Sequence, residues 1–224
     1  MFNDIRAAQE PELRNQGIYY WFDEADITHG FALIRGHSMT PYEGLLGLFE
    51  FKFGEDYPFS PPHVIWKTHD GVTRFHPQFY KGGKVCLSIL GTWDGPGWSS
   101  SINLVSILQI LQSLLVENPL ACEPGYETGT LRDPKFVAYK EYLEYRIARY
   151  MIHHLLLWKQ TPEQSPWYPF QEEVSEIVPS LVSFWKTRVY QKSQEGEQGF
   201  SETYFITAGQ TRWKELCDLV PKLE

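Results

Sequence analysis

The sequence has few of the features that would place the chain in a membrane, in an oxidising compartment or on nucleic acid. It holds only three cysteines, Cys86, Cys122 and Cys217, and they lie far apart, which suits a reducing compartment better than a disulfide scaffold. No apolar run approaches the roughly 18 residues that a membrane-spanning helix needs, and no apolar signal-peptide core follows Met1. The net charge is −8, and no cluster of Lys and Arg supplies the basic face that nucleic acid would require. We therefore expect a cytoplasmic or nuclear protein that binds neither nucleic acid nor a membrane.

What the sequence does contain is enough apolar material for a folded core. Hydrophobic residues make up 42% of the 224 residues and aromatic residues 16%, which argues against intrinsic disorder. A chain of this length is expected to hold one domain, with room for an extension.

The hydrophobic pattern predicts an α+β fold. Helices are expected over residues 4–14, 102–116 and 133–159, weaker helices over 172–190 and 211–220, and strands over 30–35, 45–53 and 64–66. Pro11 should weaken or kink the first helix, residues 99–101 offer an N-cap before residue 102, and Asp133-Pro134 marks the start of the long helix. Short turns between the strands favour an antiparallel meander.

Residues 75–90 form the most organised local motif. Cys86 ends a turn-rich loop and precedes a short apolar run, and the side-chain amide of Gln78 stands eight residues earlier, introduced by His76-Pro77. This arrangement makes Cys86 a candidate nucleophile. The alternative is a buried and inert thiol, which is a common state of an intracellular cysteine.

The motif resembles the active-site loop of the ubiquitin-conjugating enzymes, which place a cysteine eight residues after a His-Pro-Asn tripeptide. The resemblance extends from residues 57–64, which read Tyr-Pro-Phe-Ser-Pro-Pro-His-Val, through residues 86–90 and Trp98-Ser99 to residues 117–119. It covers about residues 4–158 and implies the ubiquitin-conjugating (UBC) fold: an N-terminal helix, an antiparallel meander sheet, the active-site loop and C-terminal helices. We therefore predict a UBC core domain at 4–158 and a mostly helical extension at 159–224 that serves packing or partner docking.

The resemblance implies a transferase that works through a thioester. Cys86 would accept ubiquitin, or a ubiquitin-like modifier, from an activating enzyme and pass it to a lysine amine of a protein substrate, usually with a RING-type ligase. Such chemistry needs a reachable thiol and a stabilised oxyanion. It needs no metal and no cofactor of its own, because ATP is used by the activating enzyme.

Three further residues receive catalytic or supporting roles from the resemblance. Gln78 stands where the family has Asn, as an oxyanion donor or a brace for the loop, and His76 is expected to support the turn. Glu123 is the acid nearest to the position where the family often has Asp beside the acceptor lysine; the alternative is a solvated turn carboxylate.

A second set of residues matches the loops with which the family meets RING-type ligases. Phe59, Pro62, Trp98 and Ser99 make up this set, although Phe59 also suits core packing and Ser99 a helix cap. The N-terminal helix carries mixed charges rather than the basic residues that the family usually has there. The sequence therefore does not identify the activating enzyme or the modifier.

The loop between Cys86 and Trp98 indicates which subgroup of the ubiquitin-conjugating enzymes the chain resembles. Residues 92–98 and 123–127 look like the larger, extended conjugating enzymes, including the giant hybrids that are also inhibitors of apoptosis.

Two alternatives to an active enzyme are a UBC-fold protein that only binds ubiquitin, which Gln78 keeps open, and an unrelated cysteine hydrolase. The hydrolase would need a positioned His with an orienting Asn or Asp, and no signature supplies them.

Overall fold

The computed structural model describes residues 1–196, 199–202 and 207–223, and these residues form two compact units. The first unit holds Met1–Gly36 and Leu46–Leu115, and the second holds His37–Leu45 and the chain from Val116 onward. Among the described residues, no helix combines the length and the hydropathy that crossing a bilayer requires. The division into domains at residue 158 stays a prediction.

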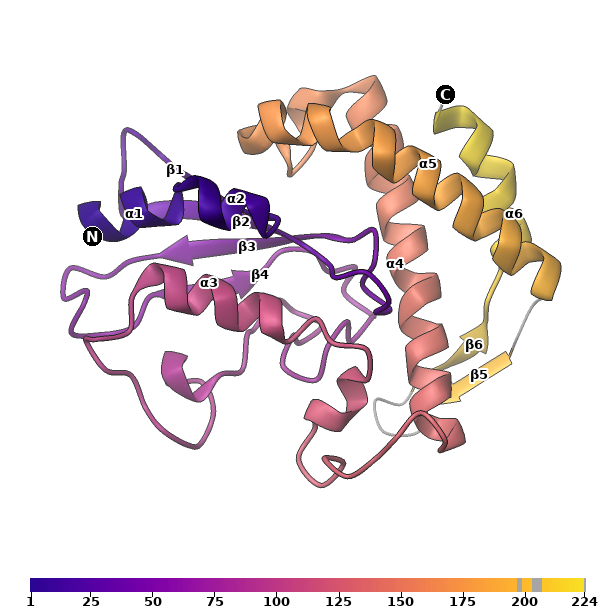
Figure 1. The fold of residues 1–224 in the computed structure, drawn as a ribbon, viewed down its shortest axis with the longest axis horizontal. Helices are drawn as coiled ribbons and strands as arrows, with labels where there is room; N and C mark the ends of the chain where they lie inside the picture. The colour runs from indigo at the N-terminus through magenta and orange to yellow at the C-terminus, as the bar shows by residue number, and fades with distance from the viewer. Residues whose placement is uncertain (197–198, 203–206, 224) are drawn as a thin grey trace. The chain divides into compact units, whose positions relative to one another are not determined.

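The first unit is built on a four-stranded antiparallel sheet. Strands β1 (Ile18–Phe22), β2 (His29–Arg35), β3 (Leu46–Lys52) and β4 (His63–Trp66) lie side by side in chain order, which is the predicted meander (Figure 1). Helix α1 (Phe2–Ala8) packs on β1 and on α3 (Leu104–Ser113), and α3 also contacts β2. Strand β3 does not alternate in burial, because Glu50 is buried between Phe49 and Phe51, and only Lys52 at the end of the strand is exposed.

Three details of this unit differ from the expectation. The predicted helix over residues 4–14 is two helices, α1 and α2 (Pro11–Asn15), because Pro11 takes the first position of a new helix. Helix α3 is capped by Asn103, whose Oδ1 accepts the Ser106 N–H at 2.9 Å, and not by residues 99–101. Strand β1 was missed because its run of aromatic residues lacks a clear period of two.

An aromatic cluster forms the centre of the sheet's packed face. Trp66 of β4 lies 4.8 Å, ring to ring, from both Phe49 of β3 and Phe79. Phe79 is fully buried and belongs to the loop that follows the sheet. Its ring therefore packs the loop that leads to Cys86 against the aromatic side chains of the sheet.

The second unit is mostly helical. Its long helices are α4 (Pro134–Gln160) and α5 (Gln171–Glu195), followed by the β5 (Gly199–Glu202) and β6 (Thr207–Gln210) hairpin and by α6 (Trp213–Leu219). The predicted start of α4 is confirmed, because the Asp133 side chain accepts the Lys135 N–H at 3.0 Å and Pro134 follows it.

Helix α5 is longer than the sequence indicated and passes through Pro179. A proline inside a helix removes one backbone hydrogen bond, so the pattern predicted only a weak helix there. The apolar stripe at helical spacing is buried and outweighs that loss; it consists of Val174, Ile177, Leu181, Trp185 and Val189.

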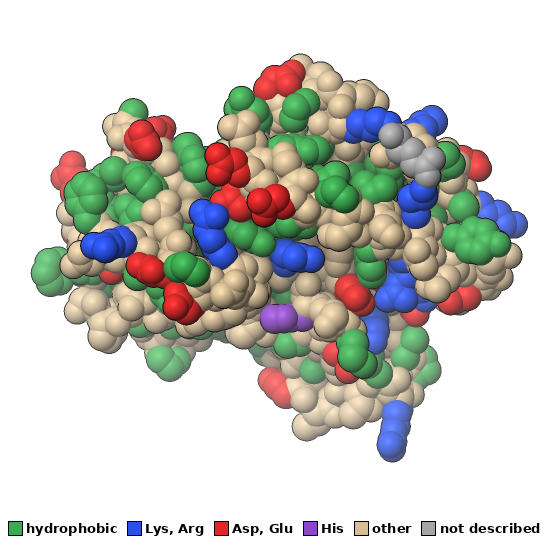
Figure 2. All heavy atoms as spheres, turned by 45° about the horizontal axis from the view of Figure 1, so that its top comes forward, with side chains coloured by type: hydrophobic (Ala, Val, Ile, Leu, Met, Phe, Trp, Pro, Cys, Tyr) green, Lys and Arg blue, Asp and Glu red, His purple; other side chains and the backbone are tan. Residues whose placement is uncertain are grey.

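Charged side chains of both signs are interspersed on the surface. On the face that Figure 2 presents, Lys and Arg side chains lie among Asp and Glu side chains and hydrophobic ones.

Candidate active site

A short hairpin places Gln78 and Cys86 opposite each other in the first unit. The Cys86 N–H donates to the Gln78 carbonyl at 2.9 Å, the Tyr80 N–H donates to the Lys84 carbonyl at 2.9 Å, and Phe79 bridges Val85 between them. Opposed residues of an antiparallel pair send their side chains to the same face. The eight-residue spacing in the sequence is therefore the length of this hairpin, and it puts the thiol and the amide on one side.

The turn before the hairpin is held by two side chains. The Gln78 N–H donates to Nδ1 of His76 at 3.1 Å, and the Arg74 guanidinium donates to the Pro77 carbonyl through Nη2 at 2.6 Å. The same guanidinium lies 3.4 Å above the centre of the Tyr80 ring, which is a cation–π contact. The turn that carries Gln78 is therefore fixed from both sides.

His76 is built to stay neutral. Its side chain is fully buried, and this burial, helped by the charge of Arg74, lowers the pKa of His76 to about 3. With Nδ1 accepting the Gln78 amide, the ring supports the turn and cannot serve as a general base near pH 7. This also removes His76 as the base of a cysteine hydrolase.

Cys86 is 4% exposed, and its flanking backbone amides are already engaged. The Cys86 N–H is bonded to the Gln78 carbonyl, and the Leu87 N–H donates to Oγ1 of Thr92 at 2.9 Å. Neither amide is free to stabilise an oxyanion at the thiol. The opposed side-chain amide of Gln78 is therefore the candidate donor in the first unit.

Thr92 is the residue of this site that the sequence argument missed. It stands in the loop after Cys86 and is half-buried, and its hydroxyl contacts the Val85 carbonyl at 2.7 Å as well as the Leu87 N–H. A threonine six positions after the cysteine carries no signal of its own in a loop rich in turn-forming residues, so only the fold reveals it.

The residues predicted to meet a ligase lie on two joined loops. The Trp98 indole N–H donates to the Pro58 carbonyl at 2.8 Å, which connects the two segments. Phe59 is 82% exposed and Ser99 is exposed, whereas Pro62 is buried and Trp98 is half-buried. The joined loops therefore present an exposed phenyl ring and a hydroxyl.

Glu123 belongs to the second unit. It is half-buried and follows the 3-10 turn η2 (Pro119–Cys122), where its N–H donates to the Leu120 carbonyl at 3.1 Å. Burial raises the pKa of the neighbouring Cys122 thiol, which keeps this second thiol protonated. The structure thus brings together Cys86, Gln78 and His76, while the role of Glu123 rests on the sequence.

A metal site finds no support in the part of the chain that the structure describes. No group of three His, Cys, Asp or Glu side chains there is arranged to hold an ion. His153 and His154 of α4 pack against each other, with ring centres 5.4 Å apart, and His154 stacks on Tyr150.

Comparison with known proteins identifies relatives over most of the chain. The family model described as "Ubiquitin-conjugating enzyme" matches residues 3–133, more than half of the chain. Ubiquitin-conjugating enzyme E2 Z of Danio rerio is 37% identical over 188 residues, which cover 83% of this chain and 57% of that protein. Human E2 Z is 49% identical over 112 residues, covering 50% of this chain and 32% of that protein. The human dual E2 ubiquitin-conjugating enzyme/E3 ubiquitin-protein ligase BIRC6 is 42% identical over 125 residues, covering 52% of this chain and 2% of that protein.

Solved structures share the fold. The H. polymorpha ubiquitin conjugating enzyme Pex4p, solved in complex with the soluble domain of Pex22p, is 25% identical with a TM-score of 0.51, over 66% of this chain and 94% of that one. The E2 domain of a Toxoplasma gondii ubiquitin conjugating enzyme, 21% identical with a TM-score of 0.50 and the same coverage, supports the fold alone. The matched stretches span 57% and 36% of the length of the first two curated relatives, less than two thirds of either.

Proposed function

Because the chain belongs to the ubiquitin-conjugating enzyme family, we propose that it carries ubiquitin or a ubiquitin-like modifier as a thioester on Cys86 and transfers it to a lysine amine. One observation supports this above the others: the backbone pairing that sets Gln78 opposite Cys86. The family's motif spacing thus corresponds to a defined geometry in this chain.

The first step is a thioester exchange. The Cys86 thiolate attacks the carbonyl carbon of the modifier's C-terminal glycine, which the activating enzyme presents on its own cysteine. The bond to the sulfur of the activating enzyme breaks, and that sulfur leaves as a thiolate. No cofactor on this chain takes part, since the thioester already holds the energy of the bond.

The second step is aminolysis. A lysine amine attacks the carbonyl carbon on Cys86, negative charge develops on the carbonyl oxygen, and the carbon–sulfur bond breaks with Cys86 leaving as a thiolate. The Gln78 side-chain amide donates to the developing oxyanion. The proton of the amine is assigned to Glu123 on its sequence position alone. Neutral His76 keeps Gln78 in place.

Partners follow from these two steps. They are the modifier, an activating enzyme, a lysine-bearing protein substrate and a RING-type ligase. Phe59 and Ser99 on the joined loops form the surface that we assign to the ligase, while Trp98 joins the two loops and Pro62 is buried.

A charging assay tests the function. The protein is incubated with an activating enzyme, ATP and ubiquitin and analysed on gels with and without reductant; a reductant-sensitive band larger by one ubiquitin is expected. Cys86→Ala should abolish the band, and Cys86→Ser should give a slower-reacting oxyester that resists reductant.

Cys122→Ala and Cys217→Ala are the matched controls and should charge like the wild type. A reductant-sensitive adduct that persists in Cys86→Ala would reject the site. Failure of the wild type with several activating enzymes and modifiers would favour a UBC-fold binder without activity.

A further inference from the structure

Thr92 makes an unusual set of contacts around the nucleophile. Its hydroxyl donates to the Val85 carbonyl at 2.7 Å and accepts from the Leu87 N–H at 2.9 Å, and its own N–H donates to the Leu87 carbonyl at 3.2 Å. Val85 and Leu87 are the two neighbours of Cys86 in the chain. One side chain therefore holds the backbone immediately before and immediately after the thiol-bearing residue.

The backbone of Cys86 is thereby fixed at successive peptide groups. The Cys86 N–H is held by the Gln78 carbonyl, and the groups on either side of it are held by Thr92. The direction of a Cα–Cβ bond follows from the backbone on both sides, so these contacts fix the Cβ atom from which the sulfur extends.

We propose that Thr92 is a positioning residue for thioester transfer: its hydroxyl bridges Val85 and Leu87 and aims the Cys86 sulfur at the Gln78 amide. The proposal rests on the proposed function. By occupying the Leu87 N–H, Thr92 also prevents that amide from drawing the thioester carbonyl away from Gln78. The residue acts through Cys86 and does not itself touch the reacting atoms.

The same unit provides a matched control in Thr68. Its Oγ1 accepts the Leu48 N–H at 2.7 Å and contacts the Leu46 carbonyl at 3.4 Å, so it also bridges two residues that flank a third. Thr68 is fully buried just after the end of β4 and does not contact the residues around Cys86 through these bonds. Thr68→Val therefore removes a comparable pair of side-chain hydrogen bonds but leaves the backbone around Cys86 unchanged.

The test compares Thr92→Val, Thr92→Ser and Thr68→Val in the full chain. Each variant is charged with ubiquitin and then mixed with free lysine, and single-turnover discharge is followed at a temperature where urea unfolding shows every variant to be folded. Thr92→Val should lower the maximal discharge rate about 10-fold with little change in the lysine concentration at half-maximal rate. Thr92→Ser should restore most of the rate, and Thr68→Val should discharge like the wild type.

A second readout does not depend on ubiquitin. The rate at which iodoacetamide alkylates Cys86 is measured for each protein by peptide mass spectrometry. Thr92→Val should raise this rate by about threefold or more, because a loosened backbone exposes a thiol that is now 4% exposed. Thr92→Ser and Thr68→Val should keep the wild-type rate.

The outcomes separate the two proposals. Wild-type discharge by Thr92→Val, or an equal loss in Thr68→Val, would show that Thr92 contributes only stability and would overturn the positioning role. If the wild type does not charge at all, the proposed function fails, and alkylation alone decides Thr92: equal rates in all four proteins overturn the inference, and a selective rise in Thr92→Val supports it.

Discussion

At the scale of single residues, the candidate site carries at position 78 a side-chain amide that is one methylene longer than the Asn of the family motif. Gln78 keeps the donor of Asn and extends its reach by about 1.5 Å. The added torsion leaves more conformations to restrict. The backbone around it is fixed by His76 and Arg74, so the additional freedom lies in the side chain alone.

Replacing this amide should separate charging from discharge. Gln78→Ala should charge with ubiquitin and lose about 10²–10³ in discharge to lysine, because the oxyanion loses its donor. Gln78→Asn should charge normally and discharge at or above the wild-type rate. Single-turnover discharge is the measurement.

The control for this pair is Gln112→Ala. It removes a buried amide of the same unit, whose Nε2 donates to the Gln16 carbonyl at 2.7 Å, and should lower stability but not discharge. A large loss in Gln78→Asn would mean that the site is shaped for the longer side chain.

His76 should make the protein sensitive to acid. Its pKa is about 3 in the folded state and near 6.5 in an unfolded chain, so between these values the unfolded chain binds a proton that the folded one does not. The contribution of neutral His76 to the free energy of unfolding is therefore complete above about pH 6.5. Below that pH it falls by about 1.4 kcal/mol per pH unit until the folded-state pKa of about 3 is reached.

The measurement is urea unfolding at several pH values between about 6 and about 4. His76→Asn keeps an acceptor for the Gln78 amide and should flatten the slope by about that amount. His63→Gln, a substitution at an exposed histidine of β4, should leave the slope unchanged. An identical slope in His76→Asn would contradict the buried neutral ring.

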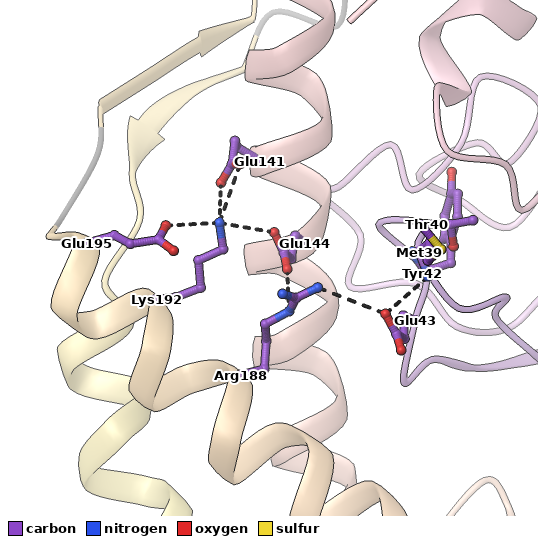
Figure 3. A network of polar contacts seen from close by, with 9 residues as sticks. All are labelled: Met39, Thr40, Tyr42, Glu43, Glu141, Glu144, Arg188, Lys192 and Glu195. Atoms are coloured by element: carbon purple, nitrogen blue, oxygen red, sulfur yellow. Dashed lines mark hydrogen bonds and ion pairs between the residues drawn. The ribbon is translucent and has the colours of Figure 1, made fainter.

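At the scale of elements, α4 and α5 are joined by a network of charges (Figure 3). The Lys192 ammonium contacts the carboxylates of Glu141 at 3.1 Å, Glu144 at 3.5 Å and Glu195 at 3.1 Å. Arg188 Nε lies 2.7 Å from Glu144 Oε1. Burial alone would lower the pKa of Lys192, but these carboxylates outweigh it and raise the pKa.

Removing the ammonium should be costly because the carboxylates would stay behind. Lys192→Met should lower the free energy of unfolding by about 2–3 kcal/mol, since the Glu144 side chain is only 9% exposed. Arg212→Met breaks an exposed ion pair with Glu215 and should change it by no more than about 0.5 kcal/mol. Denaturant unfolding measures both, and equal effects would show that burial does not matter here.

At the scale of the whole molecule, the connection between β2 and β3 belongs with the C-terminal helices. Residues 37–45 fall in the second unit, where the Trp185 indole N–H of α5 donates to the Gly44 carbonyl at 3.1 Å. Gly44 has a φ of 79°, and a Cβ there would lie 2.5 Å from the Phe184 ring. Only glycine fits this position, and α5 thus serves as a structural support for an early part of the chain.

Trp185 should consequently be essential to the fold. Trp185→Ala should lower the free energy of unfolding by about 3–5 kcal/mol, because it empties a fully buried site and removes the bond to Gly44. Tyr190→Ala, at a residue of the same helix that is 61% exposed, should cost no more than about 0.5 kcal/mol. A small loss in Trp185→Ala would show that residues 159–224 do not stabilise the chain.

The sequence by itself determined the features that depend on neighbours along the chain. The Asp133-Pro134 start of α4 and the eight-residue spacing that sets Gln78 opposite Cys86 both depend on contacts within a few residues of the chain. These features can therefore be predicted from the sequence.

Only the tertiary structure decided the features that depend on packing between distant segments. Helix α5 continues through Pro179 because its buried apolar contacts outweigh the one backbone hydrogen bond that proline removes. The tertiary structure also made His76 neutral by burial and brought the Thr92 hydroxyl between Val85 and Leu87. Burial and the partners of a hydroxyl are properties of the folded arrangement, and no local pattern encodes them.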